Sequence, residues 1–159
     1  MTIPRNQVCL CFAGTALEAA QFYAATFPDT AISHIQRAPG DYPEGQEGDV
    51  LVVVLTIMGI PVIALNAGFA HTEAFSFQVS TQDQAETDRY WDAIVGNGGQ
   101  ESRCGWCKDK WGVSWQITPR QLLEATADPD PAAAQRAFKA MMGMGKIDIE
   151  PWEPEETVG

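Results

Sequence analysis

The 159-residue chain is poor in histidine, with two, and in basic residues, with ten lysines and arginines against 21 acidic residues. The basic residues form no cluster, and the net charge of −11 is opposite in sign to that of proteins that bind nucleic acid or anionic lipid. No apolar run reaches the roughly 18 residues that would span a bilayer. These absences predict that neither nucleic acid nor a membrane is a partner.

Two further absences concern targeting and cofactors. The start, "MTIPRNQVCLCF", lacks the long apolar stretch of a secretory signal, so we expect reduced thiols at the four cysteines and a cytoplasmic protein. Nucleotide-like cofactors usually bind at a glycine-rich turn between a strand and the start of a helix. The turn "VGNGG" follows a predicted helix instead, and no cofactor is predicted.

The patterns that are present form two similar halves. Alternation, turn residues and helical spacing predict strands at 7–12, 31–37, 49–59, 60–68, 74–80, 100–109 and 111–118, and helices at 14–30 and 81–99. Thr15 with Glu18, and Thr81, are the expected helix N-caps. Two more helices are predicted after Pro119, at 119–127 and 130–144. The order strand, helix and strand group thus occurs twice, which indicates a duplicated α+β unit.

Several motifs resemble those of a known family. They are "EAAQFYAATFP" after the first strand, "ALNAG", "FSFQV", "GGQESRCGWCKDKWGVSWQITP" and "AMMGMGKIDI". Together they cover nearly the whole chain, and the stretch from Cys104 to Gln116 is the most specific. The chain resembles the PhnB-like, or 3-demethylubiquinone-9 3-methyltransferase-like, branch of the vicinal-oxygen-chelate (glyoxalase/bleomycin-resistance) superfamily.

This resemblance implies a fold and an assembly. The implied fold is α+β, with paired βαβββ modules that form an open, incomplete barrel around a cavity, followed by C-terminal helices. It implies one domain over 1–159, with modules at about 5–68 and 73–119 and a helical tail at 120–159. It also implies a homodimer.

Metal-dependent relatives place one ligand on each of four strands. Carried onto this sequence, the four positions are Gln7, Val62, Ala74 and Gln116. Two of these side chains are aliphatic and two are neutral amides, whereas divalent ions favour imidazole, carboxylate or thiolate ligands. His71, in the loop before the fifth strand, is expected to be a solvated loop residue. We therefore expect no metal at the family position.

The stretch "SRCGWCK" raises three alternatives for Cys104 and Cys107. They could form half of a zinc site with Cys9 and Cys11, a redox centre, or a hairpin in which the thiols are small apolar fillers. Cys9 and Cys11 alternate on one face of a strand and do not form a knuckle, and a redox thiol would stand at a helix N-terminus. The hairpin is the favoured interpretation.

Strand alternation separates a core face from a face lining the cavity. The core face is predicted to hold Val8, Leu10, Phe12, Ile63, Leu65, Phe75, Phe77, Val79, Val113, Trp115 and Ile117. The cavity face is predicted to bind a ligand through Gln7, Cys9, Cys11, Asn66, Ser76, Gln78, Ser114 and Gln116, with Trp106 as a possible lid or dimer contact. Alternatively, these polar groups only hydrogen-bond one another or line a dimer contact. Trp91 is expected in the core, and Asp109 in a turn that its side chain stabilises.

A neutral, polar cavity of this kind fits a small organic ligand. No acid or base is predicted to point into it, so no catalytic residue is assigned. The favoured hypothesis is a metal-independent small-molecule binding protein with an unknown ligand. The alternatives are a metal-independent enzyme of the same fold, such as a lyase, isomerase or transferase, and a regulatory or structural dimer without a ligand.

Overall fold

The computed structural model describes residues 2–153, which form two compact units divided between His71 and Thr72. Unit 1 precedes this boundary and unit 2 follows it. Across the described residues, no helix combines the length and apolar character needed to cross a membrane.

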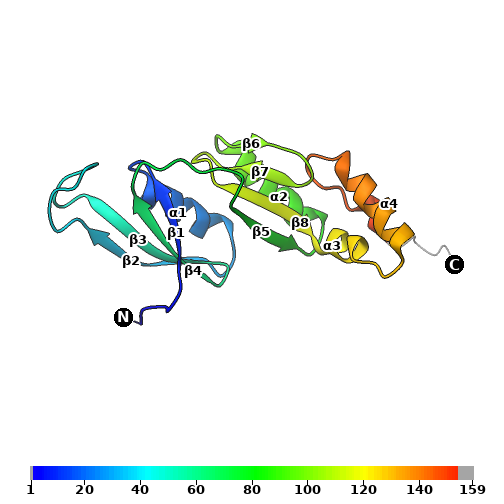
Figure 1. Ribbon diagram of the computed structural model, residues 1–159, viewed down its shortest axis with the longest axis horizontal. Coiled ribbons are helices and arrows are strands. Elements are labelled where there is room, and N and C mark those ends of the chain that lie inside the picture. The colour runs from blue at the N-terminus through cyan, green and yellow to red at the C-terminus, as the bar shows by residue number, and fades with distance from the viewer. Residues whose placement is uncertain (1, 154–159) are drawn as a thin grey trace. The chain divides into compact units, whose positions relative to one another are not determined.

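Unit 1 is a four-stranded sheet with one helix. Its elements are β1 (Val8–Phe12), α1 (Ala16–Thr26), β2 (Ala31–Arg37), β3 (Val50–Ile57) and β4 (Ile60–Asn66). The strand order is β1-β4-β3-β2, with β1 parallel to β4 and the other neighbours antiparallel. Figure 1 shows α1 lying across one face of this sheet.

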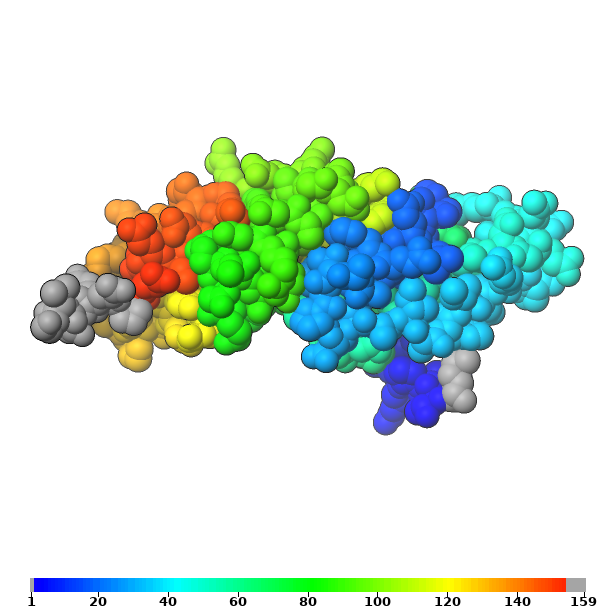
Figure 2. Space-filling model, turned by 180° about the vertical axis from the view of Figure 1, so that it is seen from behind, coloured from blue at the N-terminus to red at the C-terminus, as the bar shows by residue number. Residues whose placement is uncertain are grey.

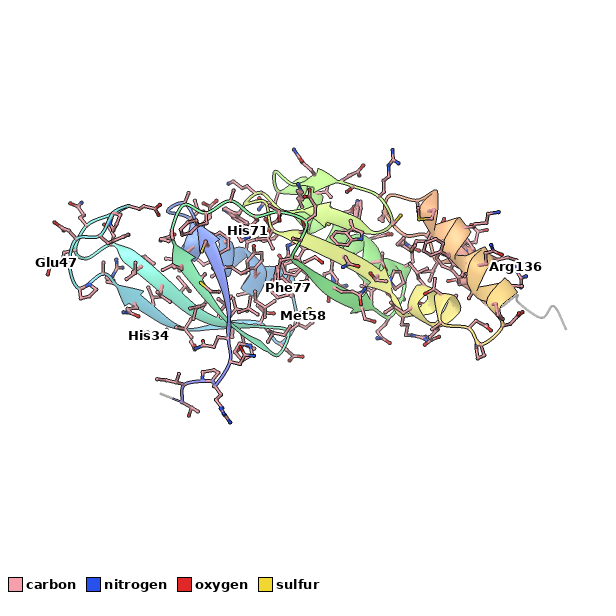
Figure 3. All side chains as sticks on the ribbon, in the orientation of Figure 1. His34, Glu47, Met58, His71, Phe77 and Arg136 are labelled. Carbon is pink, nitrogen blue, oxygen red and sulfur yellow. The ribbon has the colours of Figure 1, made fainter. Side chains whose placement is uncertain are left out.

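The hairpin between β3 and β4 is the turn predicted at Met58 and Gly59, marked by the Met58 label in Figure 3. Both residues have positive φ angles, 45° and 86°. Positive φ at both central positions is the signature of the two-residue turn whose twist matches that of the flanking strands. The prediction of a hairpin here is confirmed.

The core of unit 1 lies between α1 and the sheet. Tyr23 of α1 is buried, as are Val53, Leu55 and Ile57 of β3, which alternate toward the helix. Leu10 and Phe12 of β1 are buried on the same side, as the alternation of this strand predicts.

Unit 2 repeats the order of unit 1. Its elements are β5 (Ser76–Thr81), α2 (Gln84–Gly96), β6 (Gln100–Glu101), β7 (Trp106–Lys108) and β8 (Ser114–Pro119). The strand order is β5-β8-β7-β6, with β5 parallel to β8. The predicted α+β class with two βαβββ modules is confirmed, and among the described residues neither sheet closes into a barrel.

Three short helices follow β8, namely α3 (Arg120–Thr126), α4 (Pro131–Met142) and the 3₁₀ turn η1 (Glu150–Trp152). They pack on one another, and α3 also contacts β8. The side chain of Asp130 caps α4 by accepting a hydrogen bond from the Ala132 amide, and Pro131 occupies the first turn, where no amide donor is needed. The last residues of the predicted tail, 154–159, lie outside the described residues.

Of the two predicted N-caps, Thr15 is at the predicted position without a capping hydrogen bond, and Thr81 was wrong. Helix α2 starts after Asp83, whose side chain accepts a hydrogen bond from the Glu86 amide at 2.8 Å, while Thr81 ends β5. Thr15 stands at the N-cap of α1 but makes no capping hydrogen bond. The Ala16 amide instead donates to Oδ1 of Asn66 at 2.9 Å, a residue fifty positions away in β4.

Candidate functional site

The sheet face of unit 2 that points away from α2 carries a cluster of polar side chains, which we call the unit 2 open face. Paired residues point to the same side of a sheet, so the ladders place Ser76, Gln78, Trp106, Lys108, Ser114 and Gln116 together. Four of the six, Ser76, Gln78, Ser114 and Gln116, were predicted on one face from alternation, and Trp106 was predicted as a lid or dimer contact. The structure brings these five together.

The amide of Gln116 is the centre of a hydrogen-bonded network on this face. Its Nε2 donates to Oγ of Ser76 at 2.9 Å, and its Oε1 accepts from Nε2 of Gln78 at 3.3 Å. Part of the cluster therefore matches the alternative prediction that these polar groups hydrogen-bond one another. A ligand that bonded Gln116 would replace at least one of these contacts.

Ser114 differs from its neighbours because its hydroxyl is buried, 1 % of the residue being exposed, and has no hydrogen-bond partner within residues 2–153. Buried polar atoms are nearly always paired, so a lone hydroxyl marks an unmet donor and acceptor.

Lys108 is a charged residue of this face that was not predicted from the sequence. It follows Cys107 in β7, pairs with Ser114, and forms an ion pair with Glu73. The hydrogen bond from Lys108 lowers the pKa of the Glu73 carboxyl. The alternation of Trp106, Cys107 and Lys108 was the available signal, because it places both outer residues opposite the buried thiol.

Asp109 is structural, as predicted for a turn residue. Its Oδ1 accepts hydrogen bonds from the backbone amides of Trp111 and Val113 at 2.9 and 3.0 Å. Its Oδ2 accepts from the indole of Trp115 at 3.0 Å. This buried carboxylate therefore fixes the turn between β7 and β8 and orients the largest core side chain of unit 2.

A hollow of about 500 Å³ lies on the open face of the unit 1 sheet, the face away from α1. Its walls include Val52, Val54 and Ile63, with Gln7 and Gln36 among its polar groups. The N-terminal residues, dark blue in Figure 2, project from unit 1, and Thr2, Ile3 and Pro4 contribute to the wall. Gln7 is the predicted ligand residue that this hollow includes.

The predicted facing of β4 was wrong. Val62 and Ala64 are buried on the α1 side, and Ile63 and Leu65 lie on the open face, because the ladder pairs them with Cys9 and Cys11. The segment "IPVIALN" is apolar at both alternating sets, so its pattern does not distinguish the two faces.

Asn66 shares the α1 side with Val62 and is not on the face of Cys9 and Cys11. Besides capping α1 it donates from Nδ2 to the Val50 carbonyl oxygen at 2.8 Å. Its amide thus ties the start of α1 and the start of β3 to the end of β4. A separate, smaller hollow of about 310 Å³ includes Asn66 with Tyr42 and Glu44.

Cys9 and Cys11 lie on the open face of unit 1, the first exposed and the second half-buried. Nε2 of His71 donates a hydrogen bond to the Cys11 carbonyl oxygen at 2.6 Å, and its ring lies 5.7 Å from that of Phe12. The expectation that His71 is a solvated loop residue was therefore wrong, since the ring fastens the end of unit 1 to β1.

The stretch with Cys104 and Cys107 is a hairpin, as favoured from the sequence. The Ser102 amide donates a hydrogen bond to the Trp106 carbonyl oxygen across its turn. Cys104 and Gly105, within the turn, have positive φ angles. Cys107 is buried at the centre of β7, and burial, with a smaller effect of Asp109, raises the pKa of its thiol to about 12. A thiol of this kind is a core side chain and not a nucleophile.

The residues at the four positions of the metal-dependent relatives are two aliphatic side chains and two neutral amides. Val62 faces α1, Ala74 is exposed ahead of β5, and the Gln116 amide is bonded to Ser76 and Gln78. In residues 2–153 no group of three or more histidine, cysteine or acidic side chains is arranged to hold a metal ion.

Comparison with solved structures identifies similar folds. A putative 3-demethylubiquinone-9 3-methyltransferase, PhnB protein, from Bacillus cereus is 28% identical, with a TM-score of 0.65 over 73% of this chain and 99% of that one. Protein PA1353 from Pseudomonas aeruginosa is 19% identical, with a TM-score of 0.58 over 74% and 98%. No curated protein matches the chain.

The family comparison covers most of both units. The model of the family described as 3-demethylubiquinone-9 3-methyltransferase matches residues 4–118, from the segment before β1 into β8. The same span contains the "FY" of α1, the Asn66 cap and the β7–β8 turn. The resemblance seen in the sequence is thereby confirmed, and the chain belongs to the 3-demethylubiquinone-9 3-methyltransferase family.

Proposed function

We propose that this chain is a metal-independent binding protein for a small organic molecule, of the glyoxalase/bleomycin-resistance type. The hollow on the open face of unit 1 carries this proposal, since its volume of about 500 Å³ lies in the range of small-molecule pockets. Apolar side chains from β3 and β4 line it, and Gln7, Ser33 and Gln36 supply a few polar groups, the usual division between affinity and orientation.

A blocking variant tests the proposal. We expect compounds from a metabolite library that raise the melting temperature of the wild-type protein to lose this effect in Val54→Trp, which fills the hollow. Ile35→Trp is the matched control, because Ile35 pairs with Val53 and points to the opposite side of the same sheet. Compounds that stabilise both variants equally would place binding elsewhere and contradict the proposal.

The reaction in the family's name is not carried over to this chain. Methyl transfer requires a bound methyl donor, and a glycine-rich turn is the usual place for a nucleotide-like cofactor. The glycines of the turn after α2 have a structural explanation instead. A Cβ at Gly99 would lie 2.3 Å from the Ile94 carbonyl oxygen and 2.4 Å from that of Lys108, so glycine is needed for close packing of the backbone.

A second candidate is a metal-independent enzyme, such as a lyase, isomerase or transferase, and the Lys108–Glu73 pair favours it. An ammonium and a carboxylate beside Ser114 and Gln116 offer proton donors and acceptors on the unit 2 open face. We expect any turnover found in a metabolite panel to fall sharply in Lys108→Met, with Lys146→Met as the matched control. Turnover that is unchanged in Lys108→Met would contradict a catalytic role for the Lys108–Glu73 pair.

We also propose a cytoplasmic homodimer. The four cysteines are all unpaired thiols, as expected in a reducing compartment. The edge strands β1 and β2 of one sheet and β5 and β6 of the other leave backbone groups that a second copy can cover. Sedimentation at micromolar concentration should give twice the chain mass, and a monomer would contradict the proposal.

A further inference from the structure

Cys9 and Cys11 are two metal-ligating side chains on the unit 1 open face, and nothing in the proposed function uses them. Both project from the same side of β1, beside Ile63 and Leu65 of β4. We propose that these two cysteines form a binding site for a soft monovalent cation, with Cu(I) as the ion it takes.

Strand geometry favours a bridging ion over a direct disulfide. Alternate residues of a strand are about 6.6 Å apart along the chain, near the upper end of the Cα separations of disulfides. Their side chains point in parallel and not toward each other. A metal–thiolate bond is about 2.3 Å long, so two thiolates on one ion span up to roughly 4.6 Å between sulfur atoms.

The surroundings select a soft ion that needs few ligands. The neighbours on β4 are aliphatic, and the described residues contain no set of three histidine, cysteine or acidic side chains that would hold an ion. The Nε2 atom of His71 is directed at the Cys11 carbonyl oxygen. Zinc in proteins almost always takes four ligands, whereas Cu(I) prefers thiolates and is stable with two of them in a linear arrangement.

The charge balance defines how binding depends on pH. Each thiol loses its proton when its sulfur binds the ion, so two S–H bonds are exchanged for two S–Cu bonds and two protons are released. Burial, with the neighbouring Cys11, raises the pKa of the Cys9 thiol. Because each sulfur gives up its proton when it binds the ion, the apparent affinity should rise as the pH rises.

Anaerobic titration with Cu(I), in competition with a chromophoric Cu(I) chelator such as bicinchoninate, measures the site directly. We expect one ion per chain, and a loss of at least about 100-fold in affinity in Cys9→Ser and in Cys11→Ser. Cys104→Ser is the matched control and should bind as the wild type does. Zinc titrated under the same conditions should bind at least about 100-fold more weakly, because two further ligands are missing.

Alkylation of the wild-type protein provides a test that does not depend on the folding of a variant. One equivalent of Cu(I) should protect Cys9 and Cys11 from N-ethylmaleimide, as read by peptide mass spectrometry, while Cys104 stays as reactive as before. Binding that survives in the Cys9→Ser/Cys11→Ser double variant, or equal protection of Cys104, would overturn the proposal. The site does not rest on the organic-ligand hypothesis, since Val54→Trp should leave Cu(I) binding unchanged.

Discussion

The two units share one order of elements but differ in what their open sheet faces carry. In unit 1 the open face is mainly aliphatic and hollowed, with Val52, Val54 and Ile63 among its walls. In unit 2 it is polar, and Gln116 hydrogen-bonds two of its neighbours. The apolar face gains free energy when a ligand or another surface covers it, whereas the polar face already satisfies much of its own hydrogen bonding.

The two units also differ in how the N-terminus of their helix is capped. The N-terminus of α2 is capped by its own flanking residue, Asp83, while that of α1 is capped by Asn66 from the far end of unit 1. A local cap stabilises a helix on its own, and a distant cap does so only once the sheet has formed. The duplication thus preserves the order of strands and helices while the stabilising contacts of each unit have diverged.

The largest expected effect tests the assignment of faces in unit 2. Trp115 is fully buried, stacks on Phe77 with ring centroids 4.9 Å apart, and bonds Asp109. Trp115→Ala should lower the free energy of unfolding by about 3–5 kcal/mol, as truncation of a core aromatic usually does. Trp106→Ala, on the opposite face, should cost clearly less in the same urea titration. Equal losses would mean that the two faces are not distinct.

The next effect compares the two caps. Asn66→Ala leaves the buried Ala16 amide and the Val50 carbonyl oxygen without partners, and should cost about 2 kcal/mol. Asp83→Ala removes an exposed cap and should cost about 1 kcal/mol. Chemical denaturation of both variants measures the difference. A cost for Asp83→Ala as large as that of Asn66→Ala would contradict the view that α1 depends more on its distant cap.

The third prediction concerns the contribution of the Cys107 thiol to the pH dependence of stability. Its pKa is raised from 9.0 to about 12 in the folded chain, so the folded state holds the thiol proton more tightly than the unfolded state does. This contribution is fully present below pH 9 and is lost as the pH rises toward 12, at about 1.4 kcal/mol per pH unit. The stability of Cys107→Ala, followed between pH 8 and 10, should fall less steeply than that of the wild type. Parallel curves would show that the thiol does not contribute.

The smallest effect concerns Gln116. Its two hydrogen bonds are partly exposed, so Gln116→Ala should cost about 1 kcal/mol or less in stability. If a ligand binds the unit 2 open face, the same change should weaken binding by about 1–3 kcal/mol, measured by calorimetry. A variant that unfolds would show that the network belongs to the core of unit 2.

The element order and the two faces of β8 were predicted well from the sequence, because apolar and polar residues alternate strictly along this strand. In "VSWQIT" bulky apolar residues alternate with Ser114, Gln116 and Thr118. Val113, Trp115 and Ile117 are buried as expected, and Ser114 and Thr118 of the polar set are buried as well. Phe75 was the exception in unit 2. It lies before β5, is 41 % exposed, and contacts Phe77 edge-on at 5.2 Å.

What could not be predicted depended on contacts between distant residues. The facing of β4 is decided by its pairing with β1 and β3, since both of its alternating sets are apolar. The role of Asn66 required knowing that the end of β4 meets the start of α1. The Lys108–Glu73 pair joins β7 to the segment before β5, a contact that no local pattern encodes.

The parallel pairing of the first and last strand in each unit has a consequence for synthesis on the ribosome. Val8 pairs with Val62, and Ser76 pairs with Ser114, so each sheet stays incomplete until its final strand has emerged. All strand pairings of unit 1 lie before Ala67, so its sheet can assemble while unit 2 is still being translated. We therefore expect the nascent chain to fold in two steps, each delayed until the strand that closes the sheet has emerged.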